Sequence, residues 1–371
     1  MFLSNFGRAL FVLFMICLIF TFSVAIATAQ TINLSGKPGL QAAYDPQRDL
    51  LYIPLIDTNR IAVVDMDTQV QTHTILGTNG GPIGIDINSA ATRIAVTNET
   101  AQTIQLFDLN TESVIDSYDF SFITDHQPGE LAILASGNIL FGFQNNGSGG
   151  LSFKKVSAWN PSEGTLTTFG PSLQEPHYIG RSYGRHTVVT LESNMNPAWG
   201  IAYDENLTEI CRNQNIPTDY SGSVPPHPGY NITAVNEIGT RIFAGKNVYN
   251  HNFQLITTLP EYSEPIFLSD GTILALSNDT GSNFTSFTKM NAGTGSVIST
   301  GLLPEPVSDL PDVFLVLASP PPPIPLAKAR NYFPPGLNRI CAVDRANNKV
   351  VVFTVQVEPP ASVNMPWDML E

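Results

Sequence analysis

The chain has 371 residues and a formal net charge of −14, with 18 basic side chains against 32 acidic ones. This balance excludes nucleic acid and anionic membrane surfaces as partners, because both require a basic surface. Only three cysteines occur, and Cys17 lies in an apolar N-terminal segment. Cys211 and Cys341 fall in distant repeats, so we expect two buried thiols and a fold stabilised by packing rather than by a disulfide bond.

Residues 1–29 have the pattern of a secretory signal peptide. Arg8 is their only charged residue, residues 9–26 are almost entirely apolar, and Ala27-Thr28-Ala29 is a small-residue cleavage site. The apolar run is marginal for spanning a bilayer, so we expect cleavage, with membrane attachment only if the segment is retained. The sequence therefore predicts a secreted, periplasmic or cell-surface protein whose mature chain is one unit more negative.

Residues 82–118 show the repeating unit of the chain most clearly. Apolar residues alternate with small or polar ones over 83–87, 93–97 and 103–107, which is the period of half-buried strands rather than of helices. Asn, Asp and Ser side chains, which close turns by bonding nearby backbone, lie between these segments. A fourth strand is expected at 113–118, which completes a four-stranded antiparallel unit and predicts one blade of a β-propeller.

Two landmarks recur along the rest of the chain and alternate with each other. A proline, tolerated at the first residue of a strand, precedes each innermost strand, at Pro38, Pro82, Pro128, Pro176, Pro226, Pro265 and Pro311. An Asp or Asn ends each third strand, at Asp65, Asp108, Asn160, Asp204, Asn250, Asn291 and Asp344. The sequence therefore predicts an all-β protein with a seven-bladed propeller at 30–357 and a C-terminal tail at 358–371.

The N-terminal segment of the mature chain is expected to close the ring. Residues 31–34 precede Pro38 much as residues 72–76 precede Pro82. They therefore resemble a fourth strand that belongs to the blade before blade 1, which in a ring is blade 7. Pairing there latches the circle and removes a free strand edge.

The repeat resembles that of the YVTN-type seven-bladed β-propellers over residues 31–357. Ala95-Val96-Thr97-Asn98 reproduces three of the four letters of that motif, and residues 81–85 and 107–111 match the family consensus. The later blades depart from it, since Leu276-Ser277-Asn278 keeps only the final Asn. The resemblance implies an extracellular or periplasmic protein that acts as a binding platform, and it does not indicate a ligand.

No contiguous catalytic motif for haem attachment, a serine nucleophile, phosphate or zinc occurs, so a site must be assembled from several blades. Residues beside the strand-starting prolines should ring one mouth of the central channel. The candidate ligand-binding residues there are His126, Glu130, Glu175, His177, His227, Glu264 and Asp312. Imidazoles and carboxylates can bind a divalent cation, and the competing interpretation is that they are solvated loop residues.

Two functions are compatible with these features. Our first hypothesis is an exported or surface-attached monomer that binds a protein or glycan partner through this mouth, without catalysis. The alternative is a propeller-type hydrolase or lactonase with a metal or an acid-base pair at the same mouth. No cofactor is expected beyond the divalent cation that such a site could hold. The acidic mouth should favour a cation, an amine or a basic partner over phosphate.

Overall fold

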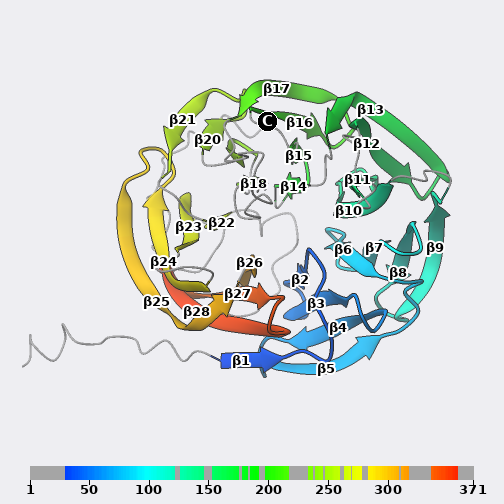
Figure 1. Cartoon of the computed structure of the whole chain (residues 1–371), viewed down its shortest axis with the longest axis horizontal. Helices are drawn as coiled ribbons and strands as arrows, with labels where there is room; N and C mark the ends of the chain where they lie inside the picture. The colour runs from blue at the N-terminus through cyan, green and yellow to red at the C-terminus, as the bar shows by residue number, and fades with distance from the viewer. Residues whose placement is uncertain are drawn as a thin grey trace, which may run out of the picture.

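The computed structural model describes residues 30–121, 126–145, 153–174, 178–182, 184–191, 197–216, 233–236, 239–244, 247–259, 263–268, 270–277, 283–308, 311–316 and 336–357. All regular structure in these ranges is β, in seven four-stranded antiparallel sheets. The sheets follow one another around a central axis, so the fold is a seven-bladed β-propeller (Figure 1). The predicted fold class is therefore confirmed.

The first four blades follow the chain from the innermost strand outward. Blade 1 contains β2 (Ala43–Asp45), β3 (Leu50–Leu55), β4 (Arg60–Asp65) and β5 (Val70–Ile75). Blade 2 contains β6 (Pro82–Ile87), β7 (Arg93–Asn98), β8 (Thr103–Asp108) and β9 (Ser113–Asp119). Blade 3 contains β10 (His126–Ile133), β11 (Ile139–Asn145), β12 (Phe153–Asn160) and β13 (Thr165–Gln174). Blade 4 contains β14 (Tyr178–Arg181), β15 (Thr187–Leu191), β16 (Ala198–Asp204) and β17 (Glu209–Ile216).

The last three blades complete the ring, and blade 7 combines both ends of the described chain. Blade 5 contains β18 (Thr233–Val235), β19 (Arg241–Ala244), β20 (Asn247–Asn250) and β21 (Leu255–Thr258). Blade 6 contains β22 (Ser263–Phe267), β23 (Thr272–Ser277), β24 (Asn283–Asn291) and β25 (Val297–Ser308). Blade 7 contains β26 (Pro311–Val316), β27 (Gly336–Asp344), β28 (Lys349–Val357) and β1 (Gln30–Asn33).

Innermost strands start on one face of the ring, which we call the top face, and end on the opposite bottom face. Pro82 and Pro311 are the first residues of β6 and β26, and Pro128 and Pro265 lie near the starts of β10 and β22. Pro38 lies before β2 and forms an isolated bridge with Leu55. Pro82 and Pro311 occupy the predicted position at the start of a strand, where no ladder donor is needed. Pro128 and Pro265 are instead the third residues of β10 and β22, where the strand pairing is irregular, so the prediction is wrong for the exact position of these two. Pro176 and Pro226 lie outside the described residues.

The inner three strands of a blade are buried on both faces, which differs from the half-buried strands predicted from residues 83–107. β6 is buried at all six residues, whereas only the outermost strand β9 is mostly exposed. The reason is that each blade packs between two neighbours. For example, Ile61 of blade 1 and Ile94 of blade 2 belong to one apolar cluster between these blades.

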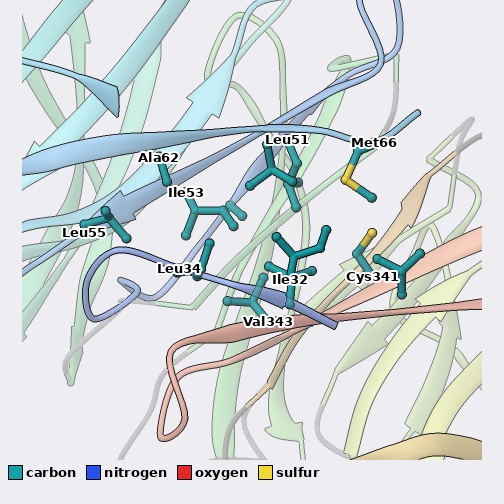
Figure 2. Close-up of a cluster of buried hydrophobic side chains, with 13 residues drawn as sticks. Ile32, Leu34, Leu51, Ile53, Leu55, Ala62, Met66, Cys341 and Val343 are labelled. Atoms are coloured by element: carbon teal, nitrogen blue, oxygen red, sulfur yellow. The ribbon is translucent and has the colours of Figure 1, made fainter. Parts of the chain in front are cut away.

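The ring is closed by the N-terminal strand, as predicted. β1 pairs antiparallel with β28, from Gln30 opposite Val352 to Asn33 opposite Lys349. Figure 2 shows Ile32 and Leu34 extending from this strand into the apolar cluster between blades 7 and 1. Both side chains are buried, so the latch contributes apolar packing as well as backbone hydrogen bonds.

The Asp and Asn landmarks close turns by accepting backbone hydrogen bonds, as predicted. Asp65 Oδ1 accepts from the N–H groups of Asp67 and Thr68, and each of the other six landmarks accepts in the same way. Six of the seven end a third strand. The prediction is wrong for Asp344, which ends the second strand of blade 7, because β28 is the third strand and β1 supplies the fourth.

The two cysteines of the described chain are free thiols in blades 4 and 7, as predicted. Cys341 is buried in the apolar cluster between blades 7 and 1, and burial raises the pKa of its thiol. Cys211 is only partly buried, so the expectation of two buried thiols is wrong for this residue. Its Sγ donates to the backbone oxygen of His251, and burial raises the pKa of this thiol to about 11.

Candidate functional site

The structure places part of the predicted mouth site. His126, Glu264 and Asp312 are the first or second residues of the innermost strands β10, β22 and β26, so their backbones lie at the top face. The side chains of these three residues lie outside the described part of the structure. Glu175, His177 and His227 lie outside the described residues altogether. The convergence of the seven candidates therefore stays a prediction.

Glu130 is the candidate whose side chain the structure describes, and it joins two blades. It lies in β10 of blade 3, and its Oε2 accepts a hydrogen bond of 2.7 Å from the backbone N–H of Ile179 in β14 of blade 4. The carboxylate is half-buried and replaces a strand partner on the axis-facing edge of β14. Glu130 therefore has a structural role in addition to any contact with a ligand.

Replacing Glu130 with alanine should lower the free energy of unfolding by about 1–3 kcal/mol, the typical cost of leaving a buried donor without its acceptor. Glu130→Gln keeps a carbonyl oxygen that can accept from Ile179, so its loss should be smaller. Urea denaturation of the two variants checks this prediction. Equal stability of Glu130→Ala and the wild type would contradict the bridging role.

Side chains from other blades cap the axis-facing edge of β10. Gln41, which precedes β2 in blade 1, accepts from the Leu131 N–H at 2.9 Å and donates to the Leu131 oxygen at 3.3 Å. One amide group thus satisfies both backbone groups of Leu131, as a neighbouring strand would. Gln41 reaches past blade 2 to make this contact, so it ties blade 1 directly to blade 3.

The close approach of blades 2 and 3 requires a residue without a side chain at Gly84 in β6. A Cβ there would lie 2.6 Å from the backbone oxygen of Gly129 and 2.6 Å from Oγ1 of Thr97. The Thr97 hydroxyl donates to that same Gly129 oxygen at 2.7 Å. Thr97 is the third residue of the motif that resembles YVTN. Its contact with blade 3 therefore explains why a threonine occupies this position.

A buried ionic cluster continues the capping of β10 toward the bottom face. Asp86 Oδ2 in β6 accepts from the Ile133 N–H at 2.9 Å, and Arg185 donates to the Ile133 oxygen at 2.9 Å. Arg181 donates to both oxygens of Asp86, at 2.6 and 2.8 Å, and Arg185 donates to Oδ2 at 2.8 Å. Asp86 and Arg185 are buried, so the cluster joins blades 2, 3 and 4 away from water.

Arg185 has an unusual backbone conformation for its residue type. It lies in the turn between β14 and β15 with a φ of 64°. The corresponding turns in blades 3, 5 and 6 place Gly137, Gly239 and Gly271 in this left-handed region. A non-glycine residue there costs about 1–2 kcal/mol. The corresponding turn of blade 2 places Ala91 there with a φ of 51°, so this position accepts a non-glycine residue without ionic contacts. The ionic contacts of Arg185 offset the cost of its conformation.

Burial opposes ionisation of Asp86, but the charges of Arg181 and Arg185 and their hydrogen bonds outweigh it and hold the pKa of this carboxyl below its ordinary value. Sequence analysis missed this cluster. Asp86 is the only charged residue in β6, which is a detectable signal in an apolar strand. No sequence spacing places Arg181 and Arg185, nearly one hundred residues later, beside it.

Two exposed histidines have acidic neighbours. His73 Nε2 lies 2.7 Å from Glu112 Oε1, and His186 Nδ1 contacts Glu205.

Within the described ranges, no three His, Cys, Asp or Glu side chains lie close enough together to hold a metal ion. The same ranges contain no helix that is long and apolar enough to cross a membrane.

Comparison with known proteins supports the fold. No protein-family model matches the chain, and no curated protein matches it either. Among solved structures, the chain is similar to the β-propeller domain of Cps50 (Swd1) from Myceliophteria thermophila, with a TM-score of 0.59 and 9% sequence identity. The match covers 89% of this chain and 99% of that chain. At this identity the similarity shows the propeller fold alone, and the resemblance to YVTN-type propellers stays a prediction.

Proposed function

We propose that this protein is an exported β-propeller that binds a protein or glycan partner through the mouth on its top face, without catalysis. The observation that carries this proposal is the arrangement of the innermost strands. They begin on one face of a closed ring, with the backbones of His126, Glu264 and Asp312 at the starts of three of them. A ring of polar residues at one mouth of a propeller is suited to contact a partner.

The described polar side chains near the axis support binding rather than turnover. Gln41, Asp86 and Glu130 bond to the backbone of neighbouring blades, so they stabilise the ring. A stable ring holds the residues of its mouth at constant separations, which lowers the entropic cost of binding. The net charge of −14 favours a cationic group on the partner.

The double variant His177→Ala/His227→Ala should abolish cation binding at the mouth and leave the thermal melt nearly unchanged, because surface substitutions typically cost under about 0.5 kcal/mol. Equilibrium dialysis with Zn²⁺, followed by metal analysis, measures the binding. His73→Ala/His251→Ala, which removes two exposed imidazoles from other sites, is the matched control. Equal metal content in both variants would contradict the cation site. If the wild type hydrolyses lactones and only the His177→Ala/His227→Ala variant loses this activity, the result would support the hydrolase alternative instead of the binding platform.

A further inference from the structure

Exposed apolar side chains of the described residues gather on the outer perimeter of the ring. All of the large ones belong to an outermost strand or to the residue that follows it: Val70, Leu76, Val114, Ile115, Ile210, Leu255, Val297, Ile298 and Leu302. Figure 1 shows these outermost strands, among them β5, β9, β17, β21 and β25, along the rim. The perimeter is therefore a surface distinct from the mouth on the top face.

Four of the outermost strands place an isoleucine at the same irregularity. In β9, Val114 and Asp116 pair with consecutive residues of β8, so Ile115 is the extra residue of a β-bulge. The pairing of β17, β21 and β25 skips Ile210, Ile256 and Ile298 in the same way. A bulge redirects a side chain and needs no particular residue type. Ile256 is partly buried and packs against the apolar cluster of blades 5 and 6, whereas Ile115, Ile210 and Ile298 are exposed. These three exposed isoleucines therefore indicate a contact surface.

The outer strand of blade 2, β9, combines exposed apolar side chains with negatively charged ones. Ile115 is 47% exposed and Leu76 is 61% exposed. A Cβ at Gly77 would lie 3.9 Å from Cγ2 of Val114, so the end of blade 1 reaches the start of β9. The carboxylates of this strand and of the turn before it are Asp108, Glu112, Asp116 and Asp119.

Two of these carboxyls, those of Asp108 and Asp119, have lowered pKa values. Backbone hydrogen bonds from Thr111 and Asn110 hold the pKa of Asp108 below its ordinary value, and the backbone hydrogen bond from Ser121 does the same for Asp119. β9 is also the last strand of its sheet, so one edge of its backbone has no partner strand among the described residues. Apolar contact, negative charge and a free strand edge thus occur together on β9.

We propose that the outer surface of β9, completed by Leu76, docks an extended segment of a partner protein in which basic and apolar residues alternate. Side chains of an extended segment point alternately to opposite sides. Its apolar residues cover Leu76, Val114 and Ile115, while its lysine or arginine residues meet the carboxylates of Glu112 and Asp116. Charge complementarity selects this occupant, since a second copy of the chain would bring like charges together.

The probes for the test are the acetylated hexapeptide of alternating lysine and valine and its counterpart with glutamate in place of lysine. Fluorescence anisotropy with labelled peptides should show that the full mature chain binds the lysine peptide only, more weakly at high salt. Ile115→Ser should weaken this binding about tenfold, the effect of losing one central interface side chain. Glu112→Gln/Asp116→Asn should weaken it further. Hydrogen exchange should slow within residues 113–119 on binding.

Blade 6 offers the matched control. Ile298 has the same bulge and is 52% exposed, but no charged residue occurs between Lys289 and Glu305. Ile298→Ser should leave the affinity for the lysine peptide unchanged, with a circular dichroism melt to verify that each variant folds. A wild type that binds neither peptide would overturn the proposal. Equal affinity of Ile115→Ser and wild type would do the same, and neither result bears on the cation site at the mouth.

Discussion

Replacing Asp86 with asparagine should lower the free energy of unfolding by about 3–5 kcal/mol, because it removes the negative charge that faces the buried Arg185 and the partly buried Arg181. Asp86 accepts from Arg181, Arg185 and the Ile133 backbone, which belong to two other blades. The loss should therefore weaken the contact of three blades at once. Urea denaturation followed by tryptophan fluorescence measures it, and Asp67→Asn, at an exposed turn position, is the control.

The pH dependence of this effect has a defined sign. The pKa of Asp86 is lowered on folding, so its contribution is fully present above the unfolded value of about 4 and is lost as the pH falls through the folded value. The stability difference between wild type and Asp86→Asn should thus stay constant from neutral pH down to about pH 4 and shrink only below it. A difference that fades between pH 7 and 5 would assign the effect to another group.

Deleting residues 30–36 should lower the melting temperature by about 5–10 °C. The deletion removes the strand that pairs with β28 and exposes an apolar cluster that contains Val350 and Val352. Ile32 and Leu34 are both buried there, and each contributes about 1.5–3 kcal/mol on burial. Differential scanning calorimetry of the mature chain and the truncated chain measures the shift.

Single substitutions separate the packing of the latch from its backbone pairing. Ile32→Ala should cost about 2–4 kcal/mol, because it leaves a cavity between blades 7 and 1. Thr31→Ala, at the neighbouring exposed residue of the same strand, should cost little. An unchanged melt for the truncated chain would show that β26, β27 and β28 close the ring without β1.

The candidate mouth site shows which features of a site can be predicted from the positions of residues within the repeat. The prolines located the starts of the described innermost strands only approximately, and the backbones of His126, Glu264 and Asp312 lie at the starts of β10, β22 and β26. Repeat position could not reveal that Glu130 bonds to Ile179 of the next blade. That contact depends on the distance between β10 and β14, which the packing of two blades determines and no local pattern encodes.

The sequence by itself determined the strands, the turns and the number of blades. These depend on local chemistry, namely the alternation of apolar residues and the Asp or Asn side chains that bond to backbone two or three residues away. Repetition of that unit also identified β1 as the strand that closes the ring. Only the tertiary structure decided that Asp344 ends a second strand, that Cys211 is partly exposed, and that Asp86, Arg181 and Arg185 form one cluster. Such contacts join residues far apart in the chain, so they depend on how the blades pack around the axis.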